Sequence, residues 1–196
     1  MSTIGLLFVI NEPPAAMEEE LNAWYDTDHI PERLAIEGFL SAERYVSADH
    51  DRRYLALYDL SEVGVLHSPA YMAFAGENFT PWTRRVVSRT KVTRIEATQI
   101  YPGDAMAMSA PRFLVLRFDG IDAAAASLVT EGAKHCFASA PGVKQLRVFE
   151  GKGEDTGTFL VIVGGIGNLE SLIDPGAFAG AAGALVTTES YLPYRA

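Results

Sequence analysis

The sequence predicts an α+β fold of two tandem ferredoxin-like βαββαβ units, with antiparallel sheets packed face to face as an α/β barrel. Residues 1–104 show the order strand, helix, strand, strand, helix, strand, which is the split βαβ arrangement of a ferredoxin-like unit. Residues 111–196 repeat this order. Because helices cover only one face of such a sheet, the two open faces can bury each other within one chain.

The first unit begins with an apolar run at residues 4–10, which is expected to be a strand covered on both faces. A helix then starts near Ala15, since two prolines precede it and glutamates in its first turn favour the positive end of the helix dipole. The remaining elements are expected as strands at 39–46, 53–60 and 89–101, and as a helical region at 61–75 that Pro69 interrupts.

Residues 105–110 are predicted to be a linker between two domains, 1–104 and 111–196. The second domain is expected to contain strands at 113–118, 142–149, 158–165 and 185–194, an alanine-rich helix at 122–139 and a helical region at 168–182 that is broken at Pro175. The tandem repeat places a small apolar ligand in the space enclosed between the two sheets.

The composition excludes several classes of partner. The chain has 196 residues and a formal net charge of −9, so a nucleic-acid partner is not expected, because phosphate binding rests on basic surfaces. The apolar run at 4–10 is too short to span a bilayer and no basic residue precedes it, which argues against a membrane segment. The single cysteine, Cys136, cannot form an internal disulfide, which fits a cytoplasmic protein.

Reactive side chains concentrate in residues 21–34. Pro31 cannot donate a hydrogen bond to the carbonyl of Thr27, and it disfavours helix at Ile30. We therefore expect the first helix to stop or kink just past Asp28 and to restart at Pro31, with His29 at the joint. Residues at three- and four-residue spacing define the stripe expected to be buried: Met17, Leu21, Trp24, Asp28, Pro31 and Ala35.

The motif Trp24-Tyr25-Asp26-x-x-His29-x-Pro31, followed by Gly38-Phe39 and Arg44-Tyr45, resembles the EthD-like branch of the dimeric α/β-barrel superfamily. The resemblance covers the first half, whereas the second half resembles the fold only. It implies a barrel of two ferredoxin-like sheets. Members include cofactor-free monooxygenases, cyclases, lactone isomerases and decarboxylases, and haem-binding peroxidases, so the resemblance implies architecture more than activity.

His29 and Asp28 are the predicted catalytic residues. A histidine titrates near neutral pH and can act as a general acid or base, and a neighbouring carboxylate can orient it. The structural alternative is that His29 caps free carbonyls at the helix break. Asp28 lies on the expected buried stripe and needs a donor, for which Arg44, Arg94 or a backbone amide is the structural alternative to a catalytic role.

Trp24, Tyr25, Arg44 and Tyr45 are the predicted substrate-binding residues, although a large aromatic residue on an apolar helical stripe is more commonly part of the core. A basic cluster could instead receive a substrate carboxylate or form a solvated face; it comprises Arg84, Arg85, Arg89, Lys91 and Arg94. No cofactor and no metal are expected, since the four histidines lack ligand spacing.

The residues predict an enzyme that acts by proton transfer on a small apolar or aromatic metabolite. The resemblance implies that it is cofactor-independent and of isomerase, cyclase, decarboxylase or monooxygenase type. The first alternative is a non-catalytic ligand-binding or assembly protein. The second is a haem-binding protein, in which His135 would be the axial ligand. The expected partners are a small-molecule ligand and a second copy of the chain in a homodimer.

Overall fold

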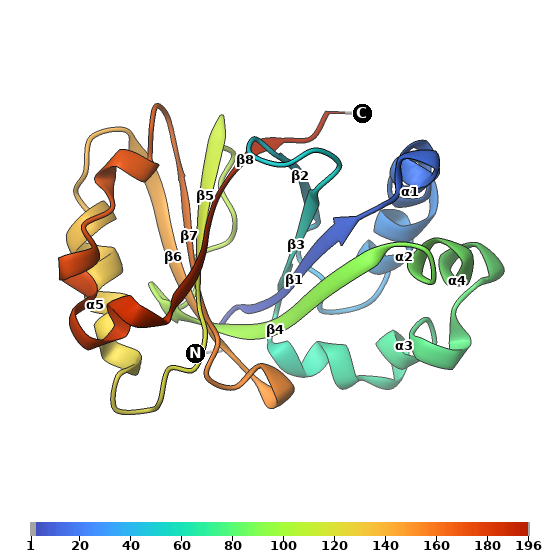
Figure 1. The fold of residues 1–196 in the computed structure, drawn as a ribbon. Helices are drawn as coiled ribbons and strands as arrows, with labels where there is room; N and C mark the ends of the chain where they lie inside the picture. The colour runs from blue at the N-terminus through green and yellow to red at the C-terminus, as the bar shows by residue number, and fades with distance from the viewer. Residues whose placement is uncertain (1–2, 196) are drawn as a thin grey trace.

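The computed structural model describes residues 3–195, in which eight antiparallel strands form one closed barrel (Figure 1). Around the barrel the strands run β1-β3-β2-β8-β5-β7-β6-β4, and β4 pairs with β1. The strands are β1 Gly5–Glu12, β2 Glu43–Ser47, β3 Tyr54–Leu60, β4 Lys91–Tyr101, β5 Arg112–Phe118, β6 Val143–Gly151, β7 Phe159–Gly165 and β8 Leu185–Pro193.

The barrel consists of two four-stranded sheets with the same strand order. The first sheet is β4-β1-β3-β2 and the second is β8-β5-β7-β6, which is the order of a ferredoxin-like unit. The sheets join where β2 pairs with β8 and where β4 pairs with β6. The predicted fold class is therefore confirmed. The division into domains at 104 and 111 stays a prediction, since all strands share one closed sheet.

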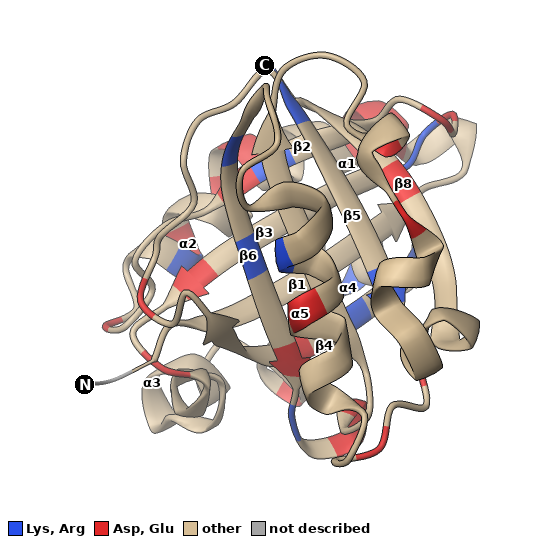
Figure 2. Cartoon of the chain, turned by 90° about the vertical axis from the view of Figure 1, so that its left-hand side faces the viewer, with Lys and Arg blue, Asp and Glu red and all other residues tan. Residues whose placement is uncertain are grey.

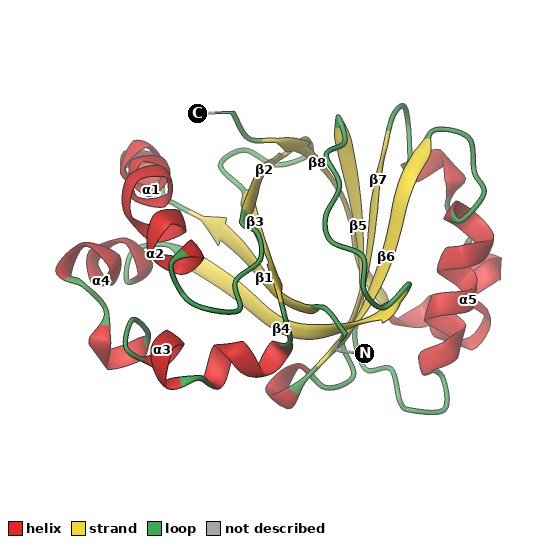
Figure 3. Cartoon of the chain, turned by 180° about the vertical axis from the view of Figure 1, so that it is seen from behind, coloured by secondary structure: helices red, strands yellow, loops and turns green. Residues whose placement is uncertain are grey.

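Helices cover the outer face of each sheet, on opposite sides of the barrel (Figures 1 and 3). The first sheet carries α1 Glu18–Trp24, the π-helical turn η2 Tyr25–His29, α2 Ile30–Leu34, α3 Pro69–Met72 and α4 Pro81–Val87. The second carries α5 Ala126–Phe137. The 3-10 helices are η1 Ala15–Met17, η3 Val63–His67, η4 Gly76–Asn78, η5 Gly153–Asp155, η6 Glu170–Leu172 and η7 Pro175–Ala184.

The interior of the barrel is packed with side chains from both sheets. Phe8 and Leu57 come from the first half, and Phe113, Phe149 and Tyr191 from the second, all of them nearly inaccessible to solvent. Two small hollows of about 50 and 40 Å³ border this cluster. His29 lines a larger cavity, of about 130 Å³, which lies outside the barrel. The space between the two sheets, where a ligand was expected, is therefore smaller than the cavity next to the motif.

Two elements differ from the sequence-based expectation. The second strand begins at Glu43, and Phe39 contributes only an isolated bridge to Leu60. Between the helical region expected at 61–75 and the strand expected at 89–101, the structure has the additional helix α4. Thr80 Oγ1 accepts a hydrogen bond from the backbone N–H of Thr83, and Pro81 occupies the first helical position. A side-chain cap followed by proline is a strong helix start, which explains the additional helix.

Charged residues of both signs are mixed on the face that carries α5 (Figure 2). This face therefore lacks the one-sided basic surface typical of a phosphate-backbone interface. Within residues 3–195, no helix combines the length and the apolar composition needed to cross a bilayer.

A buried ion pair links β3 to β6, which are not neighbours in the barrel. Arg147 Nη1 lies 2.7 Å from Asp59 Oδ1, and both side chains are 1% exposed. Asp59 Oδ2 also accepts from the backbone N–H of Ala107, in the segment between the two halves. The pair therefore joins both sheets and the connecting segment at one end of the barrel.

Replacing Asp59 by Asn should destabilise the protein by about 3–5 kcal/mol, because it leaves the Arg147 guanidinium buried without a counter-charge. Urea unfolding followed by tryptophan fluorescence measures the change. The double variant Asp59→Leu with Arg147→Met is the control and should recover much of the loss, since it removes both charges. A full-size loss in the double variant, equal to that in Asp59→Asn, would contradict this account.

Candidate functional site

The first helix does not stop before Pro31 but continues through a π-helical turn at Tyr25–His29. The backbone N–H of Ile30 donates to the carbonyl of Tyr25, five residues earlier. Thr27 Oγ1 donates to the carbonyl oxygen of Ala23 at 2.7 Å, a side-chain bond typical of bent helices. The expected stop is absent, because the chain stays helical from Glu18 to Leu34; a change to the π-helical hydrogen-bond register accommodates the missing N–H of Pro31.

The π turn shifts the buried stripe of the helix by one residue. Upstream, Leu21 and Trp24 are buried as expected. Downstream, Arg33 and Ile36 are buried, whereas Pro31 and Ala35 of the expected stripe are exposed. A single extra residue per turn rotates every following side chain by about 100°, given 3.6 residues per turn. His29 therefore faces the protein, and Asp28 moves toward the edge of the buried face.

Three aromatic rings meet at the turn. The imidazole of His29 stacks on the indole of Trp24, with centroids 4.1 Å apart and an interplanar angle of 26°. Tyr25 meets His29 edge-on at 5.3 Å. Residues five apart point in different directions in an α-helix but align in a π turn, so this stack depends on the π geometry.

His29 lines a cavity of about 130 Å³ between the outer face of β1, β3 and β4 and the helices that cover it. Trp24, Tyr25, Tyr58 and Phe79 supply aromatic walls. An apolar cavity of about 150 Å³ binds benzene in another protein, so a space of this volume accommodates one six-membered ring. Trp24 and Tyr25 lie on this wall and also pack in the core, and their role in substrate binding stays a prediction.

Most polar groups on the aromatic walls are paired. Trp24 Nε1 donates to Thr83 Oγ1 at 3.2 Å, and Asn11 Nδ2 donates to the hydroxyl of Tyr25 at 2.8 Å. By contrast, Nδ1 of His29 and Nη1 of Arg33 are buried without a hydrogen-bond partner. Buried nitrogen atoms of this kind are rare in folded proteins and call for an explanation.

The pKa of His29 is lowered well below its usual value of 6.5. The largest cause is burial, which penalises the charged imidazolium, and the positive charges of Arg33 and Arg44 add to it. Burial likewise raises the pKa of Tyr25 and Tyr58. At neutral pH the cavity therefore presents a neutral imidazole and two neutral phenols.

Arg44 lies behind Tyr25 and is not part of the cavity wall. Its guanidinium stacks on the rings of Tyr25 and Tyr194, at 4.4 and 4.0 Å from the ring centroids. It also donates to Asp26 Oδ1 at 2.9 Å and to Asn22 Oδ1 at 2.6 Å. The structure thus gives Arg44 the role of holding Tyr25 in place, and the partner of Arg44 is Asp26 and not Asp28.

Asp28 is half-buried, and its Oδ2 has no hydrogen-bond partner. No hydrogen bond or ion pair connects it to His29 among the described residues. The orientation of His29 comes instead from its stack on Trp24. Asp28 therefore lacks the contact by which it was expected to orient the imidazole.

Tyr45 lies in the barrel interior, where its ring packs on Phe113 with centroids 4.5 Å apart. Because side chains alternate along a strand, Tyr45 and Arg44 point to opposite faces of β2. Tyr45 is therefore separated by the sheet from the cavity that His29 lines.

Two arginines line the cavity, and Arg33 was not foreseen as one of them. Arg33 is 2% exposed, and its position four residues after His29 was its only sequence signal. Arg94, which had been assigned to a basic cluster, is partly exposed and pairs with Glu96. Two other members of that cluster pair with different carboxylates: Arg85 pairs with Glu20, and Lys91 pairs with Glu12.

The cavity that His29 lines does not fit a haem group, and the described residues do not gather a set of metal ligands. The His29 cavity is well below the 300–1,000 Å³ typical of cofactor pockets. His135 is exposed on α5 and lines none of the hollows described for this structure. Among residues 3–195, no three His, Cys, Asp or Glu side chains gather in a way that could hold a metal ion.

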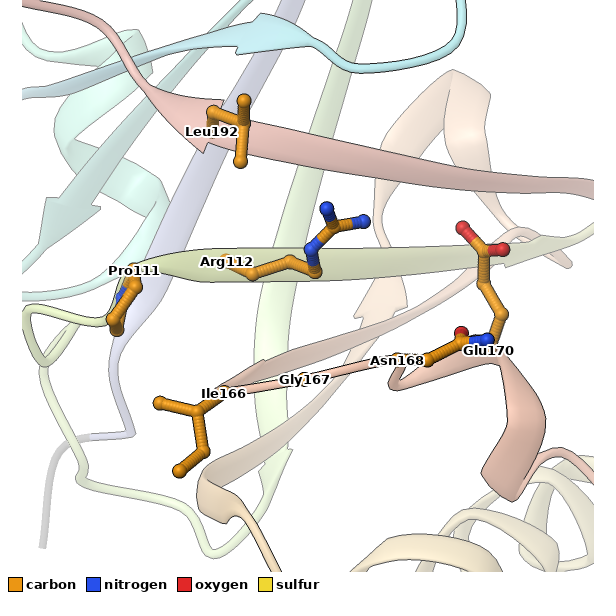
Figure 4. A pocket seen from close by; sticks show the side chains of 7 residues that line it. All are labelled: Pro111, Arg112, Ile166, Gly167, Asn168, Glu170 and Leu192. Carbon is orange, nitrogen blue, oxygen red and sulfur yellow. The ribbon is translucent and has the colours of Figure 1, made fainter.

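A wider hollow of about 600 Å³ opens on the surface of the second half (Figure 4). Arg112 and Glu170 line it, and Glu170 Oε1 accepts from Ser190 Oγ at 2.5 Å. Its wall contains no histidine, cysteine or aromatic residue. Residue types suited to proton transfer at neutral pH lie elsewhere: His29 lines the smaller cavity of the first half, and the exposed His67 lines a hollow of about 400 Å³ beside Glu96.

No family model matches the chain, and no curated protein matches it in sequence. Solved structures do match. An anthrone oxidase-like protein superposes with a TM-score of 0.69 at 13% identity, over 100% of this chain and 92% of that protein. A candidate monooxygenase from Lactobacillus acidophilus NCFM gives 0.58 at 11% identity, over 97% and 93%.

Chlorite dismutase from Candidatus Nitrospira defluvii, solved with imidazole, matches with a TM-score of 0.62 at 10% identity, over 100% of this chain and 93% of that one. At these identities the similarity shows the fold alone. The chain has the dimeric α/β-barrel fold, with both ferredoxin-like units in one polypeptide. Its assignment to the EthD-like branch stays a proposal.

The lowered pKa of His29 predicts a specific pH dependence of stability. At pH values between the folded-state pKa of His29 and 6.5, the unfolded chain binds more protons at this residue than the folded chain does. The free energy of unfolding therefore rises with pH in this range and falls on acidification. His29→Gln cannot titrate and should therefore lose less stability than the wild type between about pH 7 and pH 5. Urea unfolding at several pH values measures this, with His135→Gln, at an exposed site, as control. An equal loss of unfolding free energy on acidification in the wild type and in His29→Gln would contradict the lowered pKa of His29.

Proposed function

We propose that this chain is a cofactor-independent enzyme of EthD-like type, in which His29 transfers a proton on a small ring-shaped apolar or aromatic metabolite. The observation that carries the proposal is a neutral imidazole, with a buried and unpartnered Nδ1, on the wall of an aromatic cavity of one-ring size. Such a nitrogen is free to accept a proton from a bound substrate.

The surroundings of His29 suit an acidic substrate proton, such as one next to a carbonyl group. The imidazole accepts the proton, the electron pair of the broken C–H bond passes to the carbonyl oxygen as an enolate, and the proton returns to the same or another carbon. Arg33 places positive charge near the enolate formed in this step. Because Arg33 and Arg44 disfavour the imidazolium, His29 readily gives the proton back. The net result is an isomerisation without redox change.

A second candidate is a ligand-binding protein that performs no chemistry. The absence of a contact between His29 and a carboxylate, within the described residues, favours it, because general-base histidines are commonly oriented by such a partner. In this case the cavity would hold the same type of ring compound, and His29 would contribute a stacking surface beside Trp24.

Hydrogen exchange of a simple ketone separates the two candidates. Cyclohexanone in D₂O exchanges its α-protons through an enolate, and one ring matches the cavity volume. The wild-type protein should accelerate exchange above the rate in buffer, measured by proton NMR. His29→Gln should reduce that acceleration by about 10²- to 10⁴-fold, since its amide cannot act as a base.

Tyr45→Phe is the matched control, because it removes a polar atom from the other face of β2 and should leave exchange unchanged. Retained exchange in His29→Gln would refute the catalytic role of His29. Absence of exchange in the wild type, together with ketone-induced shifts of the Trp24 indole N–H signal, would favour the ligand-binding candidate.

A further inference from the structure

Arg33 is a buried cation that lines the cavity, and one of its hydrogen-bond donors has no partner. Its side chain is 2% exposed, and Nη1 is buried without a partner. The other end of the guanidinium is fixed: Nη2 donates to the carbonyl of Phe74 at 2.9 Å and lies 3.4 Å from Glu32 Oε2. The guanidinium also lies over the ring of Tyr71, 5.0 Å from its centroid. The free donor is thus held in one place.

A buried donor of a charged group is costly to leave unpaired, and such groups in folded proteins generally have a partner that is a protein atom, a water molecule or a ligand. The described protein atoms provide none for Arg33 Nη1. The rest of the wall near His29 is largely aromatic and apolar. A ligand oxygen in the cavity would complete the site.

Arg94, the other cavity-lining arginine, does not compete for this role. It is partly exposed, its Nη1 pairs with Glu96, and its Nη2 contacts the hydroxyl of Tyr71 at 3.5 Å. Both arginines lie near a carboxylate, but within residues 3–195 only Arg33 of the two has a buried nitrogen without a hydrogen-bond partner. Arg44 contacts Tyr25 from behind and does not line the cavity.

We propose that Arg33 is the residue that recognises the ligand's charge, and that the ligand of this cavity is a single-ring compound bearing an anionic oxygen. The oxygen accepts a hydrogen bond from Arg33 Nη1, while the ring packs among Trp24, Tyr25 and Tyr58. This inference rests on the proposed function, since it places the charged group of the substrate in the cavity that His29 lines.

Binding of benzoate and nitrobenzene tests the proposal, because the two compounds share shape and differ in charge. NMR titration of the full chain, followed at the Trp24 indole N–H, should show benzoate binding about ten- to a hundredfold more tightly than nitrobenzene. In Arg33→Met this preference should vanish, with nitrobenzene binding little changed. Arg33→Lys keeps the charge and should retain part of the preference if the Met variant does not fold.

Arg85→Met is the control and should preserve the preference, because Arg85 pairs with Glu20 and does not line the cavity. Equal binding of benzoate and nitrobenzene by the wild type, or an unchanged preference in folded Arg33 variants, would overturn the role of Arg33 but leave the ring-binding function intact. Failure of both compounds to bind the wild type would overturn the ring-binding function itself, and the two failures are thereby distinguished.

Discussion

The site depends on one missing hydrogen-bond donor, the backbone nitrogen of Pro31. Without it the carbonyl of Thr27 cannot be satisfied in the α-helical register, and the chain adopts a π turn at Tyr25–His29. The turn brings the imidazole of His29 over the indole of Trp24 and buries Arg33 one turn later. The cavity wall and its two unpaired nitrogen atoms therefore follow from a local change in helix geometry.

The overall fold could be predicted because its signals are local and occur twice. Apolar strands and helical stretches appear in the same order in both halves, and the strand order of each sheet follows from that pattern. The face on which each side chain lies was less predictable. Helical spacing places Asp28 on the buried stripe, and the π turn replaces it there with His29. Strand alternation shows that Arg44 and Tyr45 face opposite sides, but it does not tell which side carries a cavity.

Arg33 was missed for a physical reason. An arginine in the last turn of a helix ordinarily interacts with the dipole and with solvent, so its type and position predict a surface residue. Its burial depends on α3 and on the segment after it, where Tyr71 covers the guanidinium and Phe74 accepts from it. Contacts between residues 41 positions apart leave no periodic trace in a sequence.

The two halves share a fold, but they differ in the layer between helices and sheet, which is filled by side chains in the second half and contains a cavity in the first. In the second half the helix α5 packs closely on the chain that follows β7: a Cβ atom at Gly132 would lie 2.5 Å from Cδ1 of Phe178. That approach fills the layer between helix and sheet with the rings of Phe118, Phe137 and Phe178. In the first half a cavity lies between the sheet and the elements that cover it, which include the π turn and the short helices α3 and α4. Because the barrel interior between the sheets is packed in both halves, a ligand of one-ring size is best accommodated beneath the first helix, where the chain also carries the half-buried imidazole of His29 and the buried guanidinium of Arg33.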